Sequence, residues 1–188
     1  MNTTQNPSAV RSKTKITNAL FQLMKFLPYN DITVKQIIVE SHVARKTFYR
    51  NFHSKDDVLS AYIDNILYKY VHSLQQIPSY QLSPILDVIF HFCMQNQNLL
   101  FQLRDNNLLH LILNKLNLFI PMIHNQVVSS DYPLFQPFTP EQVEYIIAFN
   151  VGAVGNIILK WINQGMSDTP EYIKKTILHY LNHMSLFI

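Results

Sequence analysis

Glycine is scarce in this sequence, and its scarcity narrows the fold class. Only three of the 188 residues are glycine, at positions 152, 155 and 165. Folds built from strands and tight turns need more glycine, because glycine adopts the positive φ angles of such turns without strain. No segment has a convincing strand pattern, whereas about nine segments carry apolar residues at helical spacing. The sequence therefore predicts an all-α protein with about nine helices.

Cysteine is almost absent. Cys93 is the only one, so a disulfide within the chain is excluded and a reducing compartment is favoured. A free cysteine usually packs as a small apolar side chain. We therefore expect Cys93 in the core, with redox sensing as the alternative.

Long hydrophobic runs are also missing. The most apolar stretch, residues 108–123, is interrupted by Asn114, Lys115, Asn117 and Pro121, whereas a membrane helix needs about 20 mostly apolar residues. Residues 1–13, MNTTQNPSAVRSK, lack the apolar core of a signal peptide. A soluble, cytoplasmic protein without a membrane partner is expected.

Catalytic motifs are lacking as well. The sequence has no glycine-rich phosphate loop, no His-Glu-x-x-His pair and no Gly-x-Ser-x-Gly elbow. His91, Cys93 and His110 match no familiar zinc-ligand spacing, so core positions are the simpler interpretation. We expect neither an enzyme, nor a cofactor, nor a metal site.

Charge is sparse but unevenly distributed. Residues 1–60 carry nine Lys or Arg against four acidic residues, whereas residues 61–188 carry six against eight. Residues 1–60 are therefore basic, whereas the rest of the chain is slightly acidic. This distribution suggests that residues 1–60 bind a polyanion.

Two short helices joined by a tight turn are predicted inside this basic region. Thr33 can cap a helix whose buried face includes Ile37. The apolar pattern resumes after a few residues in a helix at 44–51, where Phe48 points inward. Helices joined so closely cross at a steep angle, which is the helix-turn-helix arrangement. Ser54 opens the next helix.

The outer face of the helix at 44–51 carries the donors that reading DNA requires. Arg45 and Lys46 can donate to guanine in the major groove, while Tyr49 is placed to hold a phosphate. Lys55 is expected to hold another phosphate at its helix N-terminus. A solvated basic surface is the alternative. The predicted DNA-binding residues are Thr33, Lys35, Arg45, Lys46, Thr47, Tyr49, Arg50 and Lys55.

Residues 32–59, ITVKQIIVESHVARKTFYRNFHSKDDVL, resemble the DNA-binding domain of the TetR family of bacterial transcription regulators. The shared elements, in order, are Thr33, Val43, Thr47-Phe48-Tyr49, Phe52 and Ser54-Lys55-Asp56. Two positions depart from the family pattern, since His42 replaces the usual turn glycine and Ala44 the usual Ser. The resemblance implies a DNA-binding domain at 1–53 and a ligand-binding and dimerisation domain at 54–188.

The remaining helices are predicted largely from their starts. The first helix should span 11–27. Three later helices, at 84–96, 140–164 and 170–187, begin with a capping hydroxyl followed by proline: Ser83-Pro84, Thr139-Pro140 and Thr169-Pro170. Between them we expect a short helix near 98–103 and a longer one near 108–128.

Homodimerisation is expected, because helix-turn-helix proteins usually bind two half-sites as dimers. In the resembling family the last two helices form the dimer interface. Gly152 and Gly155 indicate close approach of another helix, from the same subunit or a partner. The apolar stripes of the two helices give the candidate interface residues Ile147, Val151, Val154, Ile158, Trp161, Ile173, Ile177 and Tyr180.

Residues 149–166, FNVGAVGNIILKWINQGM, are similar to a TetR-like branch that includes regulators of dihydroxyacetone kinase operons. The family implies a ligand pocket between the middle helices. No buried charge stands out, which favours a neutral or apolar small-molecule inducer. Ordinary core packing is the alternative for every candidate: Tyr62, Ile66, Phe90, His91, Met94, Phe101, His110, Met122 and Asn150.

The resulting hypothesis is a dimeric DNA-binding regulator that responds to a small molecule and acts as a repressor or an activator. The alternative is an interaction protein of the same fold, a co-activator that acts through a protein partner. Duplex binding with a steep salt dependence separates the two.

Overall fold

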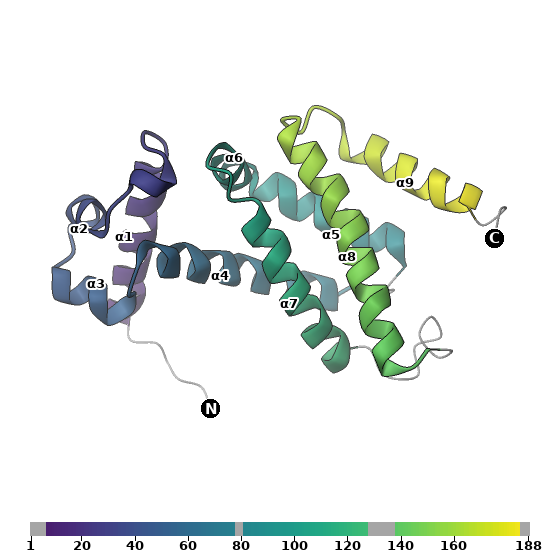
Figure 1. Cartoon of the computed structure of the whole chain (residues 1–188), viewed down its shortest axis with the longest axis horizontal. Coiled ribbons are helices and arrows are strands. Elements are labelled where there is room, and N and C mark those ends of the chain that lie inside the picture. The colour runs from purple at the N-terminus through teal and green to yellow at the C-terminus, as the bar shows by residue number, and fades with distance from the viewer. Residues whose placement is uncertain (1–6, 78–80, 128–137, 185–188) are drawn as a thin grey trace. The chain divides into compact units, whose positions relative to one another are not determined.

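The computed structural model describes residues 7–77, 81–127 and 138–184 (Figure 1). Nine α-helices, one short 3-10 helix and no strand occur in these ranges, which confirms the predicted all-α fold. The helices are α1 (Pro7–Leu23), α2 (Val34–Ser41), α3 (Arg45–Asn51), α4 (Lys55–Gln75), α5 (Leu82–Gln95), α6 (Gln97–Asp105), α7 (His110–Val127), α8 (Pro140–Asn163) and α9 (Pro170–Met184); the 3-10 helix η1 covers Tyr29–Asp31.

The chain divides into two compact units, Met1–Ile66 and Leu67–Ile188. The division falls inside α4, whereas the sequence placed a boundary at its start. The first turns of α4 belong to the N-terminal unit because their apolar residues are buried there, and Tyr62 packs against Phe21 of α1 with 4.6 Å between ring centroids.

The N-terminal unit is built around α1, which packs against both α2 and α3. Ile16 and Leu20 of α1, Ile37 of α2 and Phe48 of α3 are each 0 % exposed. Burying four such side chains contributes roughly 1.5–3 kcal/mol each before entropy is subtracted. This core fixes α3 by its inner face and leaves its outer face in solvent.

Most predicted helix starts are confirmed. The Thr33 and Thr139 hydroxyls accept the N–H of Gln36 and Gln142 in capping boxes, and the Thr169 hydroxyl accepts the N–H of Tyr172. These caps satisfy backbone donors that the first helical turn leaves unpaired.

Two predicted starts are wrong. α5 begins at Leu82 after Gln81, which makes no side-chain cap bond, so Ser83 lies inside the helix. Proline at position 84 is tolerated there because the first-turn N–H groups have no helical partner. α1 begins at Pro7 and ends at Leu23, four residues earlier at each end than predicted, since a turn follows at 24–26.

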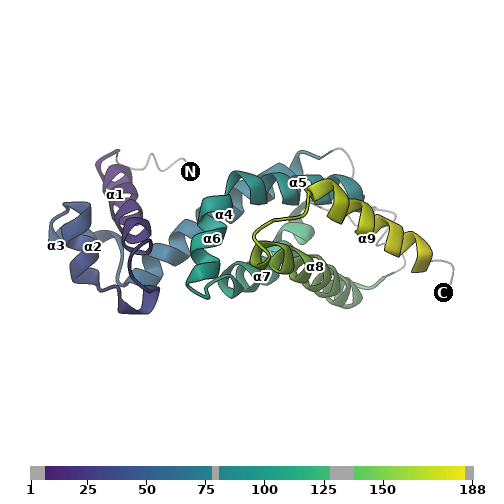
Figure 2. The same ribbon diagram turned by 90° about the horizontal axis from the view of Figure 1, so that it is seen from above.

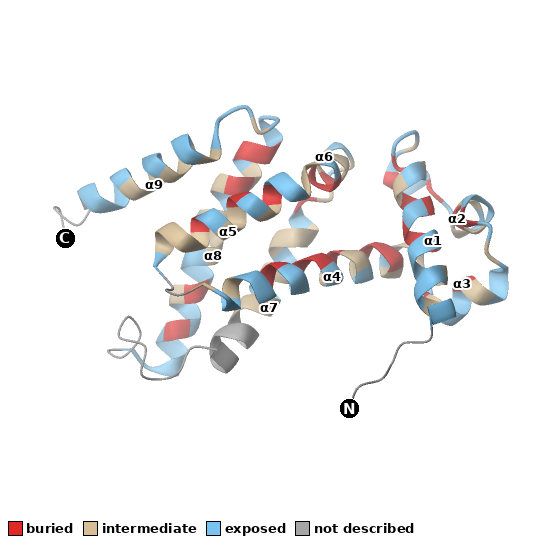
Figure 3. Ribbon diagram, turned by 180° about the vertical axis from the view of Figure 1, so that it is seen from behind, coloured by how far each residue is buried: buried red, intermediate tan, exposed pale blue. Residues whose placement is uncertain are grey.

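In the C-terminal unit (Figure 2), the buried residues come from α5, α6 and α8, from the second half of α4, and from Leu109 just before α7 (Figure 3). Trp161 of α8 is 1 % exposed and meets Phe90 of α5 edge-to-face, with 5.2 Å between ring centroids. The indole N–H donates to the carbonyl of Asp168 at 2.8 Å. This one bond satisfies the only polar atom of the Trp161 side chain, which is the most buried of the described aromatic side chains in this unit.

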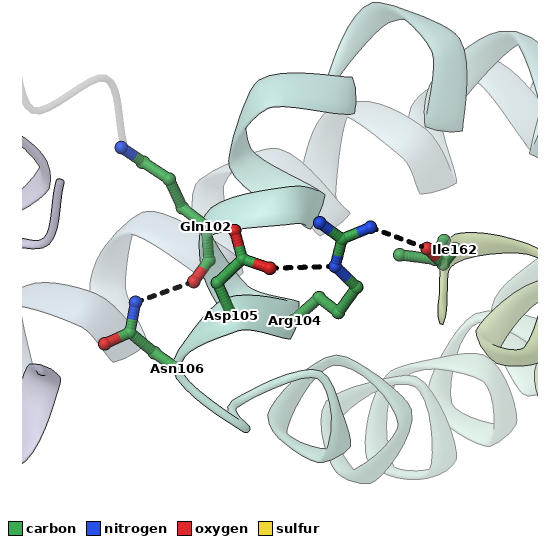
Figure 4. A network of polar contacts seen from close by, with 5 residues as sticks. All are labelled: Gln102, Arg104, Asp105, Asn106 and Ile162. Atoms are coloured by element: carbon green, nitrogen blue, oxygen red, sulfur yellow. Dashed lines mark hydrogen bonds and ion pairs between the residues drawn. The ribbon is translucent and has the colours of Figure 1, made fainter. Parts of the chain in front are cut away.

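Arg104 joins α6 to the end of α8 (Figure 4). Its Nη1 donates to the carbonyl of Ile162 at 3.3 Å, and its Nε donates to Asp105 at 2.9 Å. The guanidinium also lies 4.5 Å from the ring centre of Phe101. Arg104 therefore gives the Ile162 carbonyl a second donor, beside the N–H of Gly165 at 3.0 Å.

The two glycines of α8 have different surroundings. A Cβ at Gly155 would lie 2.7 Å from Cδ1 of Leu113, so Gly155 permits the close packing of α7 on α8. Among the described residues, a Cβ at Gly152 would meet nothing within 4 Å. For Gly155, the neighbour predicted from the sequence lies in the same subunit.

Cys93 is buried on α5, as predicted. Burial raises the pKa of its thiol to about 12, because the charged thiolate is poorly solvated in an apolar surrounding. The pKa of Tyr70 is raised as well, mainly by burial and secondly by the nearby Cys93. Such a thiol is a structural group rather than a reactive one.

Candidate nucleic-acid interface

The turn between α2 and α3 is short and partly strained. His42 ends α2 in the left-handed region, with φ 51° and ψ 35°. Ala44 precedes α3 and makes no side-chain cap bond. Both are the positions at which the sequence departs from the TetR pattern, and the turn forms nevertheless. The packing of Ile37 and Phe48 compensates for this strain.

The outer face of α3 is cationic. Arg45, Lys46, Tyr49 and Arg50 are exposed, whereas Thr47 is half-buried. The Arg45 guanidinium lies 5.6 Å from the ring centre of Tyr49, an arrangement that orients both side chains.

Phe48 holds the opposite face of α3 in the core. Its ring meets the rings of Tyr49 and Phe52 at centroid distances of 5.4 and 6.3 Å. α3 therefore combines a rigid apolar seat with a solvent-facing row of hydrogen-bond donors. This is the arrangement by which a helix can enter the major groove and contact base edges.

On α2, the two candidate residues differ. Lys35 is exposed. The Thr33 hydroxyl lies 2.7 Å from Oε1 of Gln36 and accepts the N–H of the same residue at 3.3 Å. Thr33 is thus engaged in capping α2, while Lys35 is a further exposed cation of the N-terminal unit.

Lys55 occupies a different place from the predicted phosphate contact. Its Nζ donates to the carbonyls of Tyr29, Asn30 and Ile32 at 2.7, 2.9 and 2.9 Å. Nζ also lies 4.7 Å from the ring centre of Tyr29. An ammonium has three N–H donors, so all three are used within the domain. The predicted role of the Lys55 side chain does not match this geometry.

A second bond fastens the same two elements. The Tyr29 hydroxyl donates to Asp56 at 2.5 Å. Burial, followed by this hydrogen bond and the negative charge of Asp56, raises the pKa of Tyr29. Lys55 and Asp56 together attach the first turn of α4 to η1, the turn that precedes α2. Sequence spacing could not reveal this contact, because 26 residues separate Lys55 from Tyr29.

The predicted ligand-pocket residues are only partly brought together. Phe90, His91 and Met94 of α5 line a pocket of about 250 Å³ between α5 and α9. The other lining residues were not predicted from the sequence, and two of them, Lys174 and Asp87, form an ion pair at 2.6 Å. Those missed residues are Asp87, Pro170, Glu171 and Lys174.

The other candidates lie elsewhere. Tyr62 and Ile66 belong to the N-terminal unit. Phe101 packs under Arg104, and His110 is exposed with its Nδ1 3.0 Å from the carbonyl of Asn107. Asn150 is exposed. The side chain of Met122 lies outside the described residues.

The predicted dimer stripe needs correction. Ile147, Ile158 and Trp161 are buried within the C-terminal unit, so they cannot meet a partner. Val151, Val154, Ile173 and Ile177 are half-buried, and only Tyr180 is well exposed, at 62 %. The helical period was read correctly, but the apolar stripe faces inward.

A different set of large side chains faces solvent. On α8, Tyr145 and Phe149 are 80 and 74 % exposed, and Gly152 follows on the same face. On α9, Tyr172 and Tyr180 are each 62 % exposed. We call these five residues the exposed α8–α9 face. Within the described residues, no group of three or more His, Cys, Asp or Glu side chains could hold a metal ion.

Comparison with known proteins agrees with these features. No curated protein sequence matches this chain. A solved structure, the dihydroxyacetone kinase operon activator DhaS, has the same fold, with a TM-score of 0.56, 23 % sequence identity, and coverage of 92 % of this chain and 95 % of that chain. Residues 16–62 match the family of bacterial regulatory proteins called tetR, and residues 80–183 match a transcriptional regulator C-terminal region. The chain therefore belongs to the TetR family of bacterial transcriptional regulators.

Proposed function

We propose that this protein binds operator DNA as a homodimer and inserts α3 of each copy into the major groove. The outer face of α3 carries this proposal. It presents Arg45, Lys46, Tyr49 and Arg50 to solvent, while Phe48 is fully buried beneath them. Binding to the DNA of a bacterial chromosome implies a cytoplasmic location.

The side chains divide into two roles. Arg45 and Lys46 lie in the first turn of α3, where a recognition helix contacts base edges. Tyr49, Arg50 and the exposed Lys35 of α2 would hold phosphates and fix the register. Thr47 is half-buried and can offer only its hydroxyl or methyl edge.

The exposed α8–α9 face is the proposed pairing surface. Gly152 supports this, because a glycine inside a helix is less stable than alanine by about 1 kcal/mol and no neighbour in the described part of the chain requires it. Close approach of a second α8 would explain it. By length and composition α8 could also cross a membrane. The apolar character of α8 is equally explained if one of its faces is buried in the C-terminal unit and the other is covered by the second copy.

DNA binding is tested on labelled fragments from the intergenic DNA beside the gene, at several salt concentrations. We expect tight, selective binding whose affinity falls steeply with salt. Lys46→Ala should reduce affinity for the selected fragment more than for random duplex. The matched control is Lys69→Ala on α4, an exposed lysine outside α2 and α3. Equal loss on both duplexes would contradict base reading by Lys46.

Pairing is tested by sedimentation of the full chain. Gly152→Leu should shift the dimer towards monomer, because the larger side chain blocks close approach of two helices. Ser73→Leu, an exposed control on α4, should leave the dimer intact. A wild-type monomer at all concentrations would refute the pairing. A dimer that binds no DNA would favour the alternative, an interaction protein acting through a partner. Small-molecule control stays a prediction from the family resemblance.

A further inference from the structure

Two histidines lie one helical turn apart on α9. His179 and His183 are both exposed, and their ring centroids are 4.4 Å apart with the ring planes tilted by 50°. Residues four apart on a helix are neighbours on one face. In the described part of the chain, neither ring forms a hydrogen bond or an ion pair with another side chain. The two imidazoles are therefore available to a ligand from solvent.

The chemistry of the pair suits a transition metal. Two neutral imidazoles at this spacing can bind one ion through a nitrogen lone pair each, as helical His pairs do in zinc sites. Nitrogen donors select Zn²⁺, Cu²⁺ or Ni²⁺, whereas Mg²⁺ and Ca²⁺ require oxygen ligands. No carboxylate follows on the same face, and Lys175 lies one turn before His179. The site therefore excludes hard cations.

We propose that His179 and His183 form a binding site for a divalent transition-metal ion. One chain supplies only two ligands, and a closed zinc site needs four. The pair lies on the same side of α9 as Tyr172, which belongs to the exposed α8–α9 face. A second copy can thus complete the coordination, so that the ion favours the dimer. This last step rests on the proposed homodimer.

The site itself is tested by calorimetric titration of the tag-free full chain with Zn²⁺ and with Ni²⁺. The variants are His179→Gln and His183→Gln, which keep a polar side chain at an exposed position. Each is expected to weaken metal binding about tenfold or more, because chelation needs both rings. The matched control, His72→Gln, changes an exposed histidine at the end of α4 and should bind as the wild type does. Equal affinities of wild type and His179→Gln would overturn the site.

The link to pairing is tested by sedimentation with Zn²⁺ and with EDTA. Zinc is expected to increase the dimer fraction of the wild type and to leave His179→Gln unchanged. A dimer fraction that does not respond to zinc would overturn the effect of the metal on pairing. Calorimetry would still decide whether His179 and His183 bind the metal. A chain that stays monomeric in both solutions would overturn the link and the proposed pairing together.

Discussion

Replacing Lys55 with methionine is expected to loosen the helix-turn-helix unit without removing a DNA contact. Methionine keeps the length and the apolar stem of lysine but lacks the ammonium. The variant loses three hydrogen bonds, from Nζ to the carbonyls of Tyr29, Asn30 and Ile32. It also loses the cation from the face of the Tyr29 ring.

The expected magnitude follows from the surroundings of these bonds. The bonds to Tyr29 and Ile32 are partly buried, whereas the bond to Asn30 is exposed. A net contribution of about 1 kcal/mol for each partly buried bond, and little for the exposed one, gives about 2 kcal/mol. Amide hydrogens of α2 and α3 should then exchange about 30-fold faster, since every ~1.4 kcal/mol is a factor of ten.

Hydrogen exchange and DNA titration together test this reasoning. If Lys55 acts within the domain, the slope of log affinity against log salt on a mixed-sequence duplex stays unchanged. If Lys55 instead held a phosphate, the slope would fall by about 0.9 per chain. Lys35→Met is the matched control, because Lys35 is exposed on α2. It should lower the slope and leave exchange unchanged. A lower slope with normal exchange in Lys55→Met would refute the intramolecular role.

Three further changes test other parts of the structure. Gly155→Val is expected to lower the free energy of unfolding in urea by about 1–3 kcal/mol, because its Cβ would already lie 2.7 Å from Leu113 Cδ1 and valine gains little helix propensity over glycine; an unchanged value would contradict that packing. His42→Gly is expected to raise the thermal midpoint, because relieving about 1–2 kcal/mol of left-handed strain outweighs the roughly 0.5–1 kcal/mol that glycine costs in entropy, and a lower midpoint would contradict it. Alkylation of Cys93 near pH ~8 should be slow in native protein and fast in urea, because burial raises the pKa of the thiol to about 12; equal rates would show an accessible thiol.

Local features of the fold could be predicted from the sequence. The caps at Thr33, Thr139 and Thr169 depend on residues three positions apart, and the seat of Phe48 follows from apolar spacing within one helix. Such interactions are encoded within a few residues, so a pattern in one sequence identifies them. Ser83 shows the limit, because the helix there starts earlier than its capping signal.

Features that depend on contacts between distant segments could not be predicted. The Lys55 side chain is a cation at a helix start. Either a phosphate or a set of carbonyls could accept the hydrogen bonds that its ammonium donates. The carbonyls belong to a turn more than 20 residues earlier. The pocket between α5 and α9 likewise depends on a distant contact, because Lys174 bonds to Asp87, which lies 87 residues earlier. Residue type gives the chemistry of such a group but not its partner.

The glycines of α8 show why surroundings decide what a sequence signal means. Gly152 and Gly155 give the same signal, a helix-interior glycine that is less stable than alanine by about 1 kcal/mol. At Gly155 the cause is visible within the subunit, since Leu113 occupies the space a side chain would need. At Gly152 none of the described residues occupies that space, and Tyr145 and Phe149 on the same face are exposed. One glycine therefore belongs to the packing of a single chain, whereas the other is explained only by the pairing of two chains that we propose.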